Sequence, residues 1–284
     1  MTNKIVLISG ATSGIGLQTA IQLARLSYDI YITGRNKERA EEALSIINAA
    51  RPGAAKGYFI CDYASQFSIR EVSQQISSSL QRLDVLINNA GAVFSRKVLT
   101  NEGIESTFAV NHLGYFLFTH CLLPIMLDNK AARIVNVSSA AHYSAKLSIP
   151  EVHNPKNYYA LAAYATSKLA NVLFTYKLST LLQHKGITVN CLHPGVVKTD
   201  IGNKRTGFFI GSAWSLFTFV KGISVEKGAE PSVFLASSPQ ASAFSGKYIH
   251  RQTPRSSSVL SYDTFLQDAL WEYSEKLTSI QQYI

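Results

Sequence analysis

Tyr164 and Lys168 are the two residues whose types and spacing most directly suggest acid/base chemistry. They lie four positions apart in residues 160–182, where apolar residues repeat at the spacing of a helix, so both side chains should share one face. A free phenol ionises near pH ~10, but a neighbouring ammonium favours the phenolate and lowers that pKa. The pair therefore predicts a tunable acid/base. A tyrosine at the core edge beside an amphipathic lysine would have the same spacing.

Length and composition predict one well-filled globular domain. The chain has 284 residues, of which 46% are hydrophobic and 16% are charged. This profile is far from that of disordered proteins, and no linker or repeat divides the sequence. We therefore expect a single domain over residues 1–284. The three cysteines are far apart and form no CxxC motif, so neither a disulfide framework nor a metal site is predicted.

The charge pattern and the apolar segments bear on partners and compartment. No basic and apolar leader precedes the first predicted strand, so we expect a cytoplasmic protein. The formal net charge of +9 comes from scattered Lys and Arg residues, which argues against nucleic-acid binding and suits an anionic cofactor. The most apolar window, residues 207–220, is about five residues short of a membrane span. We interpret it as a substrate-covering or surface helix, with loose peripheral membrane contact as the alternative.

The N-terminal residues predict a strand, a glycine-rich turn and a helix, which together form a dinucleotide site. In the turn SGATSGIG, Gly10, Gly14 and Gly16 would permit a tight bend, close approach of a pyrophosphate, and close packing of helix on strand. The N-terminus of the helix would then face the phosphates. The spacing GxxxGxG differs from the commonest fingerprint, GxGxxG, so the prediction depends on the strand before it and the helix after it.

The ends of the second and third predicted strands bear on which dinucleotide binds. No acidic residue follows the strand at 29–33, where one would bind a ribose 2′-hydroxyl. Arg35, with Lys37 close behind, instead offers a planar fork for a 2′-phosphate and favours NADP(H). An ordinary basic first turn of a helix is the alternative. Asp62, after the strand at 57–60, could bind an adenine amino group or cap the next helix.

Polar residues also follow the later predicted strands. Asn88 to Gly91 (NNAG) come after the strand at 83–87 and form either a close-approach turn beside a cofactor or a simple turn. Asn111 lies in an apolar stretch of the helix expected at 103–127 and is either a satisfied core amide or the holder of a water. Ser138 and Ser139 end the strand at 133–137, where a hydroxyl could hold a substrate oxygen.

Six or seven predicted strands alternate with helices along the chain. The strands are expected at 4–8, 29–33, 57–60, 83–87, 133–137, 188–192 and 247–250, and further helices at 17–26, 38–50, 65–81, 225–237 and 262–277. Residues 140–159 form a long connection. This alternation predicts an α/β fold, a Rossmann-type doubly wound parallel sheet with right-handed crossovers.

Six motifs stand together in one order: Gly10-xxx-Gly14-x-Gly16, Asn88-Asn89-Ala90-Gly91, Asn111, Ser139, Tyr164-xxx-Lys168 and Pro194-Gly195. In this order and spacing the chain resembles the short-chain dehydrogenase/reductase family over about residues 3–250. The resemblance implies that Tyr164 is the proton donor or acceptor, and that Lys168 lowers its pKa and binds the nicotinamide ribose. It further implies that Ser139 polarises the carbonyl and Asn111 holds a proton-relay water.

Three stretches, residues 134–139, 161–174 and 191–199, look like the retinol dehydrogenase and WW-domain oxidoreductase branch of that family, as does the long spacing from Ser139 to Tyr164. This branch favours NADP and hydrophobic carbonyl or alcohol substrates. The chain departs from the branch in two ways. It has no N-terminal membrane segment, which weighs against retinoid specificity, and it has Ser13 where many NADP-using members carry a basic residue.

The resemblance and the motifs together give a set of expected cofactor contacts. They are Gly10, Thr12, Ser13, Gly14, Ile15, Gly16, Arg35, Asp62, Tyr63, Asn89, Ala90, Gly91, Tyr164, Lys168, Pro194, Gly195, Val197 and Thr199. Thr199 is expected at the nicotinamide carboxamide by the resemblance, and a helix N-cap is the alternative.

The sequence analysis therefore predicts an NADP-dependent oxidoreductase that interconverts a lipophilic or aromatic carbonyl and its alcohol. The aromatic-rich segment 202–222 is expected to form a flap over the substrate, and core packing or a subunit contact is the other interpretation. A non-catalytic NADP(H)-sensing or scaffold protein, or a lyase or epimerase that uses the same Tyr–Lys pair, could share this fold. A homodimer would pair the helices near 103–127 and 160–182.

Overall fold

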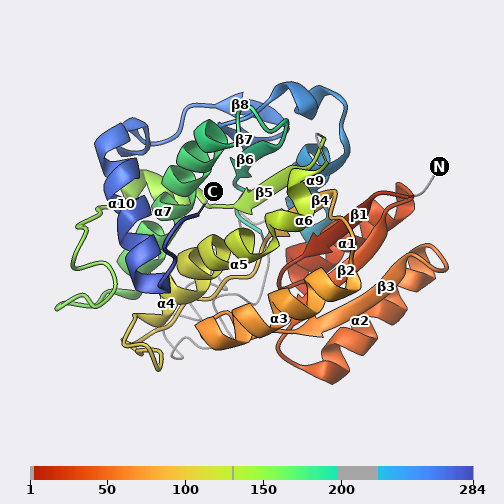
Figure 1. Ribbon diagram of the computed structural model, residues 1–284, viewed down its shortest axis with the longest axis horizontal. Helices are drawn as coiled ribbons and strands as arrows, with labels where there is room; N and C mark the ends of the chain where they lie inside the picture. Colours follow the sequence, from red (N-terminus) through yellow and green to blue (C-terminus); the bar gives the residue numbers. More distant parts are fainter. Residues whose placement is uncertain (1–2, 130, 198–222, 284) are drawn as a thin grey trace.

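The computed structural model describes residues 3–129, 131–197 and 223–283, which form one sheet between two layers of helices (Figure 1). The strands are β1 (Ile5–Ile8), β2 (Asp29–Gly34), β3 (Ala55–Ile60), β4 (Val85–Asn88), β5 (Arg133–Val137), β6 (Thr188–Leu192), β7 (Lys247–His250) and β8 (Thr253–Arg255). They lie in the order β3-β2-β1-β4-β5-β6-β7-β8. All neighbouring pairs are parallel except β7 and β8. The predicted doubly wound sheet is confirmed.

Alternating side chains on the strands explain the two helical layers. In β1, Val6 and Ile8 belong to one buried cluster and Leu7 to another, because successive residues of a strand point to opposite faces. The helices are α1 (Gly14–Arg25), α2 (Lys37–Ala50), α3 (Gln66–Ser79), α4 (Ser106–Phe108), α5 (Gly114–Leu122), α6 (Pro124–Leu127), α7 (Ala160–Leu181), α9 (Val225–Ser237) and α10 (Thr264–Thr278). Helices α1, α2 and α9 pack on the first face, and α3, α5 and α7 pack on the second. Both faces are therefore covered, as a parallel sheet requires.

The strand order fixes where a ligand can bind. From β1 the chain proceeds outward through β2 and β3, then returns to β4 on the other side of β1. The connections after β1 and β4 therefore diverge and leave a crevice at the carboxyl ends of these strands, where doubly wound sheets bind ligands. The glycine-rich turn follows β1 and the NNAG turn follows β4. The topology thus brings two of the predicted motifs to one crevice.

Two features differ from the sequence prediction. Strand β8 was not predicted: it has only three residues, and one of them, Pro254, cannot donate to a ladder, so the segment is suited only to the edge of the sheet where it lies. The single helix expected at 103–127 is interrupted by a π-helical segment, η1 (Ala109–Leu113), and then by Pro124 at the start of α6. Asn111 lies at the centre of η1.

The C-terminal segment packs on the helices that flank the predicted catalytic pair. Trp271 of α10 is 7% exposed and lies between Phe116 of α5 and Phe174 of α7, with ring centroids 5.0 and 5.9 Å away. Tyr283 completes the cluster at 4.5 Å from Trp271. An ion pair of 2.5 Å between Lys177 and Asp268 also joins α7 to α10. This part of the α5 and α7 surface is therefore covered by the chain itself.

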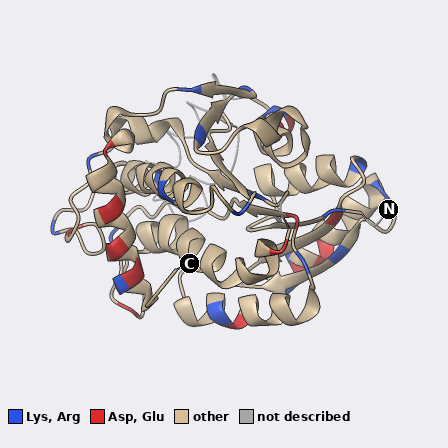
Figure 2. Ribbon diagram, turned by 45° about the horizontal axis from the view of Figure 1, so that its top comes forward, with Lys and Arg blue, Asp and Glu red and all other residues tan. Residues whose placement is uncertain are grey.

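The α10 packing bears on the expected homodimer. A twofold pairing of α5 and α7 between two copies would have to use another face of these helices or displace α10, so the dimer stays a prediction. Figure 2 shows Lys and Arg interspersed with Asp and Glu along the ribbon of the described residues. Within residues 3–129, 131–197 and 223–283, no helix has the length and apolar character needed to span a bilayer.

Candidate active site

The turn between β1 and α1 has the backbone conformation that its glycines predict. Gly10 and Gly14 have φ values of 64° and 59°, in the left-handed region that favours glycine. A Cβ on Gly16 would lie 2.5 Å from the side-chain nitrogen of Asn89 and 2.7 Å from the carbonyl oxygen of Gly10. Each of the three glycines is thus required either by its φ value or by close contact with its neighbours.

A serine that the sequence analysis did not single out joins this turn to the NNAG turn. The Ser9 hydroxyl accepts hydrogen bonds from the backbone N–H groups of Asn89 and Ala90, at 2.8 and 2.9 Å. The Asn89 side chain in turn donates to the carbonyls of Ser9 and Gly10. A small polar residue at the end of β1 was the only available signal for this role. Asn88, by contrast, points into the core, where it donates to Thr119 and Asn136.

The crevice has the features that a dinucleotide phosphate needs. Among the described residues no side chain caps α1 at Ser13, so the N-terminus of this helix suits an anion. The methyl group of Thr12 packs against the backbone of Gly34, since a Cβ added to Gly34 would lie 2.4 Å from it. Ile15 and Gly91 are both partly exposed in these turns. The residues present therefore fit a bound dinucleotide, with its pyrophosphate at the N-terminus of α1.

Replacing Gly16 by alanine tests this phosphate turn. The new Cβ would meet backbone atoms that cannot move without opening the turn. We expect the free energy of unfolding to fall by about 1–3 kcal/mol and the Kd for the dinucleotide to rise by about tenfold or more. Gly57→Ala is the matched control, since its Cβ would make an ordinary contact of 3.5 Å with Tyr31. Equal effects of the two substitutions on dinucleotide binding would contradict this account of the turn.

The expected adenosine end is built by the segments after β2 and β3. Arg35 is exposed directly after β2, and Asn36 caps α2 by accepting from the N–H of Arg39. Asp62 is exposed, and its carboxylate accepts from the N–H of Ala64. The Tyr63 hydroxyl is buried against Thr33 at 3.0 Å, so any contact of Tyr63 with a cofactor must come from its backbone.

Ser138 and Ser139 have different positions because strand alternation separates them. The Ser138 hydroxyl is buried and donates to the carbonyl of Lys168 at 2.7 Å. Ser139 is partly exposed, acts to lower the pKa of the Tyr164 phenol, and accepts from the N–H of Ala141 at 3.2 Å in the 3₁₀ turn η2 (Ala140–Ser144). Ser139, not Ser138, is therefore the serine beside the phenol.

Tyr164 and Lys168 lie on one face of α7, as the i,i+4 spacing predicts. The Lys168 ammonium is 3% exposed, donates to the carbonyl of Val137 at 2.9 Å, and lies 5.7 Å from the centroid of the Tyr164 ring. Burial lowers the pKa of Lys168 to about 7. The ammonium is therefore near its titration midpoint at neutral pH.

The expected direction of the Tyr164 pKa shift is wrong. Burial raises the pKa of Tyr164 above its usual value, and the hydrogen bond with Ser139 only partly opposes this. Burial raises the pKa of an acid because it penalises the charged form. Tyr164 is thus a protonated phenol at neutral pH, as an unperturbed tyrosine is too.

Both polar atoms of the Asn111 side chain form hydrogen bonds. It accepts from the N–H of Ala92 at 2.8 Å, donates to the Ala92 carbonyl at 3.0 Å, and donates to Ser167 at 3.0 Å. Its backbone carbonyl accepts from the side chain of Asn171 at 2.9 Å. The sequence left open a satisfied core amide or the holder of a water; the side chain is the former. Any bound water would have to use a lone pair that these bonds leave free, on the side-chain oxygen or on the backbone carbonyl of Asn111.

Asn171 is a second residue that the sequence analysis missed. It is fully buried on α7, one turn after Lys168, and its side chain reaches both the Asn111 carbonyl and, at 3.4 Å, the Val137 carbonyl that holds Lys168. It therefore ties η1 and β5 to the helix of the acid/base pair. A polar residue in an otherwise apolar stretch of α7 was its only signal.

The turn after β6, which carries the last motif, lies at the same carboxyl edge of the sheet as the crevice. Gly195 has φ 91°, and its N–H donates to the ring nitrogen Nδ1 of His193 at 3.0 Å. Burial lowers the pKa of His193 to about 4, so the ring stays neutral and can accept this bond. Pro194 is partly exposed, and Val197 pairs with Ile223 in an isolated bridge. Thr199, the window 207–220 and the expected flap 202–222 lie outside the described residues.

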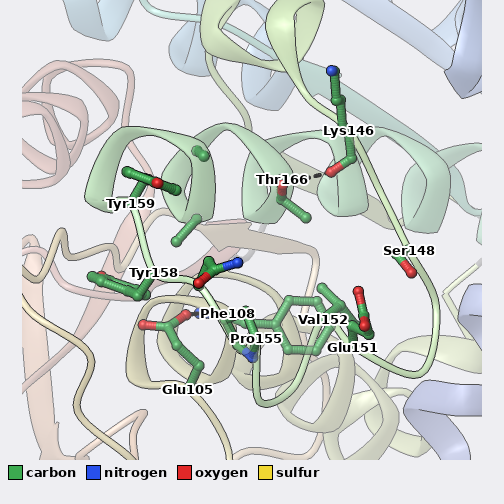
Figure 3. Close-up of a pocket in the computed structure, with 13 residues that line it drawn as sticks. Glu105, Phe108, Lys146, Ser148, Glu151, Val152, Pro155, Tyr158, Tyr159 and Thr166 are labelled. Carbon is green, nitrogen blue, oxygen red and sulfur yellow. Dashed lines mark hydrogen bonds between the residues drawn. The ribbon is translucent and has the colours of Figure 1, made fainter.

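A cavity of about 180 Å³ opens on the other side of α7 (Figure 3). Its walls include Ala162, Ala163 and Thr166, which lie on the helix face opposite Tyr164 and Lys168. The long connection 145–159 closes it, and the Glu105 carboxylate at its base caps α4 through the N–H groups of Thr107 and Phe108. None of the four expected catalytic residues lines this cavity.

Comparison with known proteins is consistent with this geometry. A family model described as short chain dehydrogenase matches residues 4–207. Human retinol dehydrogenase 13 is 37% identical, with 98% of this chain and 85% of that protein covered, and human polyprenol dehydrogenase is 35% identical, with 98% and 86% covered. Among solved structures, a variant of actinorhodin polyketide ketoreductase with NADPH is similar, with a TM-score of 0.69, 25% identity, and 87% of this chain and 95% of that chain covered.

Proposed function

The chain belongs to the short-chain dehydrogenase family, in its retinol dehydrogenase branch, and from that premise we propose that it is an NADP(H)-dependent reductase of lipophilic carbonyls. Membership supports the coarser statement directly: the protein is an oxidoreductase acting between a carbonyl and an alcohol. The observation that carries the finer proposal is the placement of the Tyr164 phenol near Ser139 and beside the buried Lys168.

The chemistry of the proposed site follows from these three side chains. The bound nicotinamide supplies or accepts the hydride. Ser139 orients the substrate oxygen by a hydrogen bond, and Tyr164 donates its phenolic proton to that oxygen as charge develops on it. Lys168 stabilises the resulting phenolate through its charge. The protonated phenol is the form of Tyr164 present at neutral pH, and it is the form that carbonyl reduction consumes.

Selectivity for NADP(H) is proposed from the end of β2. Arg35 is exposed where the adenosine ribose should lie, and the residues that follow it, Asn36 and Lys37, include no acid. The similarity to a ketoreductase solved with NADPH supports this choice. Positioning of the phosphates falls to the N-terminus of α1 and to the two turns joined by Ser9.

The substrate class is proposed from composition and relatives. The names of the two relatives specify retinol and polyprenol, which are both long apolar alcohols. In this chain the segment 202–222 is rich in aromatic residues, which suits an apolar substrate. We propose a lipophilic aldehyde or ketone, handled within a single domain in the cytoplasm or at a membrane surface.

The test of this function is binding of NADPH and NADH, followed by consumption of the reduced cofactor with aliphatic, aromatic and retinoid-like aldehydes and ketones. We expect tighter binding of NADPH and turnover with a lipophilic carbonyl class. Tight NADPH binding without turnover on any carbonyl or alcohol would favour a cofactor-sensing protein instead. Cofactor retained through turnover with no net redox change would favour a lyase or epimerase.

Substitution of Arg35 tests the cofactor choice separately. Arg35→Ser removes the charge and planar fork proposed for the 2′-phosphate, so the Kd for NADPH should rise by about 10- to 100-fold and that for NADH should change little. Arg25→Ser is the control, because Arg25 carries the same charge at the far end of α1. An equal loss of affinity for both cofactors would show that Arg35 does not recognise the 2′-phosphate.

A further inference from the structure

Lys168 lies between two phenol rings, of which only one belongs to the expected catalytic set. Its ammonium is 5.6 Å from the centroid of the Tyr115 ring and 5.7 Å from that of Tyr164. Tyr115 comes from α5, one turn after Asn111, and is fully buried. A cation within about 6 Å of a ring face is attracted by the ring quadrupole, most strongly where both are desolvated. The second ring therefore contacts the ammonium from a different element of the fold.

The Tyr115 ring, and not its hydroxyl, makes this contact. The hydroxyl is buried and has no hydrogen-bond partner among the described residues. Burial also raises the pKa of Tyr115 well above its usual value, so it remains a neutral phenol and cannot replace Tyr164 as the acid. A phenylalanine would preserve the ring face and remove no hydrogen bond.

Few other groups stabilise the charge on Lys168. The Val137 carbonyl from β5 accepts from it at 2.9 Å, and Tyr164 faces it from its own helix. None of the ion pairs formed between described residues includes Lys168. The other polar groups of the described residues around the pair include Ser138, Ser139, Ser167 and the amides of Asn111 and Asn171, and all of these are neutral.

We propose that Tyr115 is a positioning residue that keeps Lys168 in its charged form by presenting a ring face to the buried ammonium. The effect matters because burial lowers the pKa of Lys168 to about 7, where a modest interaction decides whether the amine is protonated. The assignment rests on the proposed function only for its catalytic consequence, since the charge of Lys168 is measurable without turnover.

The experiment measures the titration of Lys168 directly. Protein labelled with ¹³C at the lysine Cε is titrated by NMR, and the Lys168 resonance is assigned by its loss in Lys168→Met. We expect Tyr115→Leu to move the midpoint about one pH unit lower and Tyr115→Phe to leave it within about 0.3 of the unsubstituted protein. If Tyr115→Leu folds poorly, Tyr115→Met takes its place. Methionine fills the volume without a ring face, so we expect the same shift of the midpoint.

A second measurement links the charge to catalysis. The ammonium is present below its pKa and is lost as pH rises through it. If Tyr115→Leu lowers the pKa of Lys168, kcat/KM should therefore fall at a lower pH on the alkaline side in this variant, and not in Tyr115→Phe. Equal midpoints in all variants, or equal shifts in Leu and Phe, would overturn the role of the ring. If the protein is not a reductase, the pH profile of kcat/KM cannot be measured, but the NMR titration of Lys168 still tests the role of Tyr115.

Discussion

Tyr164→Phe should lower turnover by about 10²- to 10⁴-fold while the Kd for NADPH stays within about threefold. The substitution removes only the phenolic hydroxyl, which Ser139 influences and which holds the proton that carbonyl reduction needs. The ring remains beside Lys168, so the packing of α7 should not change. The measurement is steady-state consumption of NADPH together with direct binding of NADPH.

The matched control is Tyr159→Phe. Tyr159 precedes the first turn of the same helix and is 71% exposed, so loss of its hydroxyl should leave both turnover and binding unchanged. Near-normal turnover by Tyr164→Phe would remove the acid/base role proposed for this phenol. Loss of NADPH binding in this variant would instead indicate that the hydroxyl serves the cofactor.

Trp271→Ala should lower the free energy of unfolding by about 3–5 kcal/mol. The indole is 7% exposed and contacts the rings of Phe116, Phe174 and Tyr283, which come from α5, α7 and the C-terminal segment. Its removal would leave a cavity that these separate elements cannot close together. Urea unfolding followed by circular dichroism measures the change.

Phe265→Ala is the control for this substitution. Phe265 lies on the same helix as Trp271 but is 86% exposed, so its truncation should change stability by no more than about 0.5 kcal/mol. Similar losses in the two variants would mean that α10 is stabilised by its own helical structure and not by the aromatic cluster. A self-associating Trp271→Ala protein would show that the face beneath α10 can pair with a second copy.

Local patterns in the sequence were sufficient for the main architecture. The strand, glycine turn and helix at the N-terminus, the alternation of strands and helices, and the pairing of Tyr164 with Lys168 on one helix face all depend on residues close together in the chain. Hydrophobic periodicity and backbone preference act over this range, so they can be recognised without knowledge of the fold. Strand β8 was not predicted, because three edge residues that include a proline carry almost no such signal.

Tertiary packing decided the electrostatics and the supporting contacts of the site. Sequence spacing predicts that Lys168 is near Tyr164, but the direction of the Tyr164 pKa shift depends on how deeply both are buried. Likewise, Ser9, Tyr115 and Asn171 act across gaps of 80, 53 and 60 residues, to Asn89, Lys168 and Asn111. Desolvation and contacts between distant segments are properties of the packed interior, because they depend on which elements the fold brings together. The sequence determined which groups could do the chemistry, and the tertiary structure determined their charge and their neighbours.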